Sequence, residues 1–111
     1  MAGIDESREI VKQLLTEYAQ YSPSSGEIEM ETIFDESRGR YQLVALGWQG
    51  KRRVHGCVIH VDITENKVWL QHDSTDAEIA QTLVERGIPA DRIVLGFQPE
   101  HYRQYTGFAV S

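Results

Sequence analysis

His60 and Asp62 are the two residues of this chain best placed for acid–base chemistry. They stand two apart in a run that alternates apolar and polar residues, so both side chains point to one face of an expected strand. A carboxylate beside an imidazole can orient the ring for proton transfer, and a short turn would place Trp69 or Leu70 opposite the pair. No serine, cysteine or second acid stands at a spacing that completes a mechanism. We therefore favour a polar patch on the less buried face of a sheet over a catalytic pair.

Two other patterns are weaker candidates for a binding site. His55 and His60 are five residues apart, so on a regular strand they point to opposite faces and cannot share a metal ion. Cys57 is the only cysteine, which excludes a cysteine-rich zinc site and an internal disulfide and is typical of a small core residue. Asp73 and Asp76 flank the start of an expected helix, where they would repel a phosphate. We expect no metal, no cofactor and no catalytic residue.

Charge is distributed unevenly along the sequence. Residues 1–36 hold nine acids and two bases, residues 37–53 hold five bases and no acid, and the whole chain has a net charge of −6. Because nucleic-acid affinity comes mainly from basic side chains that neutralise phosphates, we expect no tight direct binding to DNA. The cluster Lys51, Arg52 and Arg53 is a candidate contact for an acidic partner, although a solvated turn is the simpler explanation.

Length and composition indicate one globular domain. The 111 residues are enough for a single core, and the apolar share of 41% and charged share of 25% are typical of folded proteins. We expect one domain over residues 1–111. The first nine residues lack a secretory signal, and no apolar run approaches the roughly 20 residues needed to span a bilayer. We therefore expect a cytoplasmic protein with no membrane association.

The elements that position these residues are two helices and a small sheet. Apolar residues at spacings of three and four predict a helix over residues 4–20. Four strand-like runs follow, over 27–35, 40–48, 52–63 and 67–72. The connections between the runs are too short for a crossover helix, so the strands are predicted to form an antiparallel meander.

Alternation of side chains predicts the buried faces. In the third run Cys57 and Ile59 are expected on one face and His60 and Asp62 on the other. The second run, 40–48, is apolar on both faces, and such strands are usually covered on both sides. The N-terminal helix would cover one face, and the C-terminal half or a second molecule would cover the other.

The C-terminal part is predicted to contain the second helix and a short final segment. Residues 75–78 have the spacing of a capping box at a helix start, and Gly87 and Pro89 end that helix. Residues 93–97 form a short extended run, and residues 99–105 form a last helical turn. The expected fold is α+β: a four-stranded antiparallel meander packed with an N-terminal helix and a second helix after the sheet, followed by a short strand or helix segment.

A set of segments spread over the chain forms a recognisable pattern: Gly47–Trp48, Arg53–Ile63 (RVHGCVIHVDI), Lys67–Gln71, Gly87–Pro89, Ile93–Phe97 and Arg103–Val110. This pattern resembles the XisI family, whose members are called fdxN element excision controlling factors and occur mainly in cyanobacteria. Gln98 departs from the family pattern, in which histidine is frequent. No role of that side chain is carried over.

The resemblance implies a function without catalysis. The family is named for control of the recombinase-driven removal of a DNA element during heterocyst development, in which a companion, XisH, is also needed. It supplies no catalytic residues. We expect a non-catalytic accessory protein that acts by binding proteins, as a homodimer, as a complex with an XisH-type partner, or both. The candidate contact or polar-patch residues are Lys51, Arg52, Arg53, His60, Asp62 and Trp69. The alternative is a small enzyme or ligand-binding domain that uses the face of His60, Asp62 and Trp69.

Overall fold

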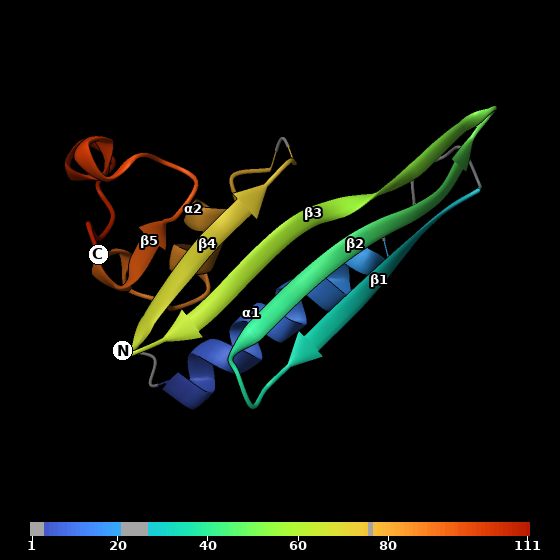
Figure 1. Cartoon of the computed structure of the whole chain (residues 1–111). Helices are drawn as coiled ribbons and strands as arrows, with labels where there is room; N and C mark the ends of the chain where they lie inside the picture. The colour runs from blue at the N-terminus through green and yellow to red at the C-terminus, as the bar shows by residue number, and fades with distance from the viewer. Residues whose placement is uncertain (1–3, 21–26, 76) are drawn as a thin grey trace.

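A five-stranded sheet runs the length of the molecule, with both α-helices packed behind it (Figure 1). The computed structural model describes residues 4–20, 27–75 and 77–111. The elements, in chain order, are α1 (Ile4–Ala19), β1 (Ile28–Asp35), β2 (Arg40–Gln49), β3 (Arg52–Thr64), β4 (Lys67–Asp73), α2 (Ile79–Glu85), β5 (Ile93–Leu95) and two 3₁₀ helices, Ala90–Arg92 and Glu100–Tyr105. The predicted α+β class and the antiparallel order of the first four strands are confirmed.

The sheet has one strand more than predicted. Ile93–Leu95 pairs with Val68–Leu70 of β4 in parallel, so the short extended run is a fifth strand of the same sheet. Two parallel neighbouring strands must be joined by a crossover connection. Here α2 lies between β4 and β5 in the sequence and packs on the sheet, so it forms that crossover. Three apolar residues bounded by a 3₁₀ turn and a glycine gave too short a pattern to predict this pairing.

The core lies between the helices and the inner face of the sheet. Val11, Leu14 and Leu15 of α1 are fully buried because their spacing of three and four places them on one stripe. Ile79 and Leu83 of α2 join the same cluster. An ion pair between Arg86 and Glu17, with nitrogen–oxygen distances of 2.6 and 3.0 Å, links the end of α2 to the end of α1. The guanidinium of Arg86 holds the pKa of Glu17 below its ordinary value.

The predicted capping box at the start of α2 is wrong. α2 begins at Ile79, and the side chain of Glu78 caps no backbone donor. The hydroxyl of Thr75 instead lies 2.6 Å from Oδ1 of Asp73 and 3.0 Å from the carbonyl oxygen of Ala77. The polar residues before the helix therefore form their own turn. Asp76 lies outside the described residues, so the repulsion expected there stays a prediction.

A β-bulge in β3 changes which side chains share a face. Leu43 pairs with Ile59 but its neighbour Val44 pairs with Cys57, so Val58 is an extra residue of β3. Val58 packs against the core, and Cys57 lies on the outer face instead of beside Ile59. The prediction that Cys57 is a core residue is therefore wrong. Its half-buried position still raises the pKa of the thiol through desolvation.

The two faces of β2 differ in what covers them. Tyr41, Leu43 and Ala45 share one face, as predicted, and they point inward under α1 and are buried. On the outer face Val44 and Leu46 are half-buried, although no described element lies in front of β1 to β3 in Figure 1. The C-terminal segment contacts β5 and β4, through the pairing of Ala109 with Val94 and the contact of Arg103 with Trp69. The predicted cover from the C-terminal half therefore does not extend to β2.

The β2–β3 hairpin extends beyond β4. β4 pairs with β3 from Thr64 back to Ile59, so no strand of the described residues lies beside the opposite edge of β3 from Arg52 to Cys57. At the same end Gly47 has φ +146°, and a Cβ there would lie 1.9 Å from the carbonyl oxygen of Glu27. The hairpin is therefore an arm with one open edge and an uncovered outer face.

Among the residues that the structure describes, no helix is long and apolar enough to cross a membrane.

Candidate functional site

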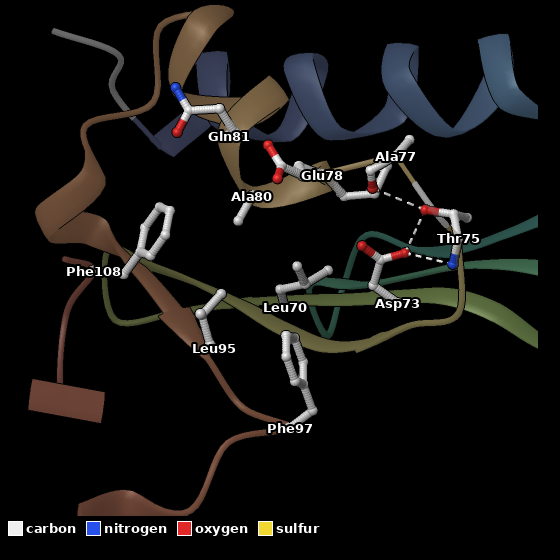
Figure 2. A pocket seen from close by; sticks show the side chains of 11 residues that line it. Leu70, Asp73, Thr75, Ala77, Glu78, Ala80, Gln81, Leu95, Phe97 and Phe108 are labelled. Carbon is white, nitrogen blue, oxygen red and sulfur yellow. Dashed lines mark hydrogen bonds between the residues drawn. The ribbon is translucent and has the colours of Figure 1, made fainter. Parts of the chain in front are cut away.

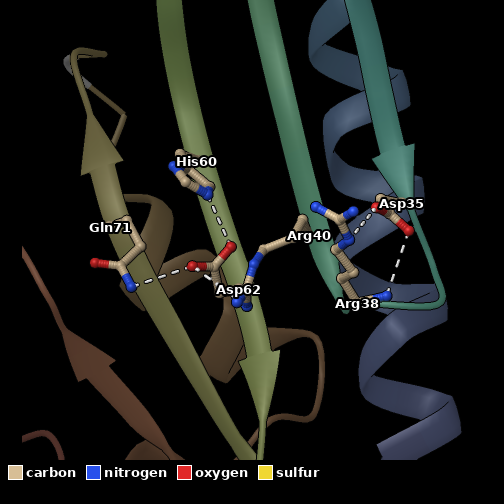
Figure 3. Close-up of polar contacts among 6 residues, drawn as sticks. All are labelled: Asp35, Arg38, Arg40, His60, Asp62 and Gln71. Atoms are coloured by element: carbon tan, nitrogen blue, oxygen red, sulfur yellow. Dashed lines mark hydrogen bonds and ion pairs between the residues drawn. The ribbon is translucent and has the colours of Figure 1, made fainter.

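Asp62 is the centre of the polar cluster on the outer face. It is 8% exposed, and both of its carboxylate oxygens have partners (Figure 3). Nε2 of His60 lies 2.7 Å from Oδ1, and Nε2 of Gln71 donates to Oδ2 at 3.2 Å. A guanidinium nitrogen of Arg40 lies 3.6 Å from Oδ2. Three side chains of its own chain thus contact this buried carboxyl group, as buried polar groups require.

Three strands position these groups. The period of two along β3 brings His60 and Asp62 to one face, and the pairing of β2 with β3 places Arg40 directly opposite Asp62. Gln71 is the extra residue of a second bulge, because His60 pairs with His72 while the next residue of β3 pairs with Leu70. That bulge lets a β4 side chain reach the carboxylate. The sequence contained no signal for either bulge.

Trp69 lies opposite Asp62, which is the position expected from the turn length. Its ring is contacted on the outer side by the guanidinium of Arg103, 5.3 Å from the ring centroid. A shallow depression of about 230 Å³ lies beside the cluster, and its lining includes Arg40, Asp62 and Trp69. The depression is open to solvent and has one acid, which is already paired. The lining also includes one hydroxyl, that of Thr64, which stands two residues from Asp62 on β3.

The basic residues form a separate group at the end of the hairpin arm. Lys51, Arg52 and Arg53 are all exposed, and Arg53 lies over the ring of Trp48 at 5.4 Å from its centroid. Trp48 pairs with Arg53, and Arg40 pairs with Asp62. Eight residues of β2 separate those two pairs, which corresponds to about 26 Å. The six candidate residues therefore do not form one site.

The two histidines of β3 share the outer face, contrary to the prediction from their spacing. The bulge at Val58 shifts the alternation by one residue, so His55 and His60 both point outward. Their partners on β2 are Leu46 and Gln42, four residues apart, so the rings are separated by about 13 Å. This separation is too large for one ion. In the described part of the chain, no group of three or more histidine, cysteine or acidic side chains could hold a metal.

A larger hollow that the sequence did not predict lies where β4 and β5 end beside α2 (Figure 2). Its volume is about 380 Å³, and Leu70, Leu95, Phe97 and Phe108 form much of its wall. Asp73 is at its polar side, where Oδ1 accepts hydrogen bonds from the backbone N–H and the hydroxyl of the Thr75 turn. Asp73 and Thr75 are therefore engaged with each other in the turn that precedes α2, and Glu78 and Gln81 add two further polar side chains to the lining. The parallel strand pair that forms the hollow was the part of the fold the sequence missed.

Comparison with known proteins gives a consistent result across the whole chain. The family model described as XisI protein matches residues 1–110. The crystal structure of a XisI-like protein from Anabaena variabilis has a TM-score of 0.91 and 43% sequence identity, with 98% of this chain and 100% of that chain covered. The structure of fdxN element excision controlling factor XisI from the same organism has a TM-score of 0.82 and 30% identity, with 97% and 98% covered. A comparison with curated proteins finds no match. The chain belongs to the XisI family.

Proposed function

We propose that this protein is a non-catalytic accessory factor that acts by binding other proteins in the control of DNA element excision. The similar protein from Anabaena variabilis that is named fdxN element excision controlling factor XisI supports the process. The observation that carries the mode of action is the outer face of β1 to β3, which no described element covers and where Ile33 is 51% and Trp48 is 47% exposed. Large apolar side chains gathered on one face are characteristic of a protein contact. The assembly would be a homodimer, a complex with an XisH-type protein, or both.

The arrangement around Asp62 favours this proposal over the alternative of a small enzyme. Both oxygens of Asp62 already have partners in His60, Gln71 and Arg40, so a substrate proton would have to compete with these contacts for the carboxylate. A general base must reach the proton that it abstracts. We infer that the cluster fixes the register of β2, β3 and β4, and that it presents a polar surface beside the apolar one.

The test is co-purification with an XisH-type protein expressed together with this chain. Trp48→Arg places a charge on the outer face, and Tyr105→Arg is the matched control, because Tyr105 is 77% exposed on the C-terminal 3₁₀ helix. We expect the wild type and the Tyr105→Arg variant to retain the XisH-type protein and the Trp48→Arg variant to lose it. Retention by all three would show that the outer face is not needed. Retention by none would remove the support for an accessory complex.

Direct binding to duplex DNA is not part of the proposed mechanism. The net charge of −6 opposes such binding, since each contact with a phosphate requires a basic side chain that releases counterions from the DNA. We expect no mobility shift of duplex DNA at submicromolar protein in physiological salt. A shift that weakens steeply as salt is added would contradict the proposal.

A further inference from the structure

The edge of β3 beyond the end of β4 presents backbone groups with which no described strand pairs. The N–H of Trp48 donates to the carbonyl oxygen of Glu27 at 3.1 Å, so Trp48 directs its backbone groups toward β1. Arg53, which pairs with Trp48, must then direct its own N–H and C=O away from β2, and His55 does the same two residues along the strand. Both residues are exposed. This edge therefore presents donors and acceptors for a further strand.

A hollow of about 280 Å³ lies along the same edge. Ala45, Val54, Gly56 and Val58 of the inner face of the arm contribute small or apolar groups to its lining. A Cβ added to Gly56 would meet no atom within 4 Å, so the space beside that residue is open. None of the described residues that line the hollow is acidic. A strand laid along the edge could therefore place an apolar side chain in this space.

The charges along this edge are of one sign. Lys51, Arg52 and Arg53 are exposed, and residues 51–61 contain no acid. The side chain of Arg53 belongs to the outer face, where it lies over the ring of Trp48. An added strand would thus meet a basic group on the outer face and the apolar hollow on the inner face. Alternation of acidic and apolar residues is the pattern that complements both.

We propose that this edge binds an extended segment of another protein in which acidic and apolar residues alternate. The segment adds a strand to β3, with main-chain hydrogen bonds to Arg53 and His55, acidic side chains on the basic outer side and an apolar side chain over Gly56. The inference rests on the proposed function and deepens it, because it adds a second contact of stated chemistry beside the outer face. The basic charges repel basic strands, so the edge selects its partner.

A second copy of the chain suits this edge less well than a different protein. Two β3 edges would bring Lys51–Arg53 of both copies to one short ladder, with no acid in residues 51–61 to compensate them. The acidic β1 of another copy would join the copies head to tail, and such a contact generates rings or filaments instead of a pair. We therefore assign the edge to a partner of different sequence.

The probe is a synthetic peptide of about ten residues, the length of a long strand, in which glutamate and valine alternate. The matched control peptide has lysine in place of each glutamate. NMR spectra of the isotope-labelled chain follow the backbone amide signals during titration with each peptide. Because the ladder is short, we expect binding in the millimolar range. The signals of Arg53 and His55 should shift with the glutamate peptide, less so in high salt, and should stay unchanged with the lysine peptide.

Two sets of variants separate strand addition from simple charge attraction. His55→Pro removes an N–H from the open edge and leaves the bonds to β2 in place, as edge strands allow, whereas His55→Ala keeps the N–H and is the matched control. We expect the proline variant to bind the glutamate peptide about tenfold more weakly than the alanine variant. Arg52→Glu with Arg53→Glu should reverse the preference, so that this variant binds the lysine peptide. Unchanged amide signals of core residues show that each variant is folded.

Absence of shifts at Arg53 and His55 with the glutamate peptide overturns the inference, as do equal responses to the two peptides or undiminished binding by His55→Pro. Shifts confined to Val44 and Leu46 also overturn it, because the peptide then lies on the outer face. Self-association of the peptide-free chain that His55→Pro abolishes would assign the edge to a second copy instead. If the edge fails these tests but Trp48→Arg still abolishes retention of the XisH-type protein, the proposed function stands and only the edge contact is refuted.

Discussion

Replacement of Asp62 tests whether the polar cluster supports the fold or is held ready for chemistry. Asp62→Asn keeps the shape of the side chain but removes the charge that attracts His60 and Arg40. Asp62→Ala also removes the acceptor for Gln71. If the cluster is structural, both variants should be less stable than the wild type, and the alanine variant should be affected more.

The size of the effect follows from the contacts. A hydrogen bond to a charged group contributes about 1.5–3 kcal/mol, but His60 and Arg40 are about a third or more exposed and regain water when the carboxylate is removed. We therefore expect a loss of about 2 kcal/mol for Asp62→Ala and about 1 kcal/mol for Asp62→Asn. The double variant Asp62→Ala with His60→Ala should lose less stability than the sum of the losses of the two single variants, because the two residues share one hydrogen bond.

Urea denaturation followed by circular dichroism measures these differences. With a slope of about 1–3 kcal/mol per molar urea, the midpoint of Asp62→Ala should fall by roughly 1 M. A midpoint for Asp62→Asn equal to or above that of the wild type would refute the reasoning. It would mean that the carboxylate is retained at a cost in stability, which is typical of residues kept for function.

Three further changes probe the core, the glycine near the end of β2 and the ion pair between the helix ends. Tyr41→Phe should stabilise the protein by about 1 kcal/mol in the same urea assay, because the buried hydroxyl has no hydrogen-bond partner among the described residues. Tyr105→Phe, at an exposed position, should leave the stability unchanged, and a destabilised Tyr41→Phe would contradict the assignment. Gly47→Ala should lower the melting temperature by several degrees, since a φ of +146° and the nearby backbone of Glu27 leave no room for a Cβ. An unchanged melting temperature would show that this position tolerates a side chain. Glu17→Gln should be less stable than the wild type at neutral pH. The difference in stability should disappear as the pH falls through the lowered pKa of Glu17, because the carboxylate that pairs with Arg86 then becomes protonated and neutral in the wild type as well. A difference that persists in acid would exclude the ion pair as its cause.

The parts of the fold governed by local periodicity could be predicted from the sequence. The apolar stripe of α1 and the short turns between the first four strands each depend on residues close together in the chain, so α1 and the antiparallel meander were correctly predicted. The parallel pairing of β5 with β4 depends on contacts between segments more than twenty residues apart. A run of three residues, Ile93–Leu95, contains too little pattern to reveal it.

The bulges explain most of what was missed at the candidate site. A single extra residue at Val58 reverses the alternation of the preceding part of β3, so Cys57 and His55 were assigned to the wrong faces. The bulge at Gln71 likewise placed an unanticipated donor on Asp62. The sharing of a face by His60 and Asp62 was predictable, because no bulge lies between them.

The unpaired edge of β3 also bears on how the protein stays dispersed at high concentration. A bare strand edge can accept a strand of another chain, and repetition of that step leads to fibres and precipitates. Here the edge begins with three positive charges at Lys51–Arg53 and ends at the Val58 bulge, and both features discourage an added strand. Neutral residues at the arm's end would therefore leave the protein correctly folded but prone to aggregate. The charges at this end act as a barrier to uncontrolled assembly whether or not a partner ever binds them.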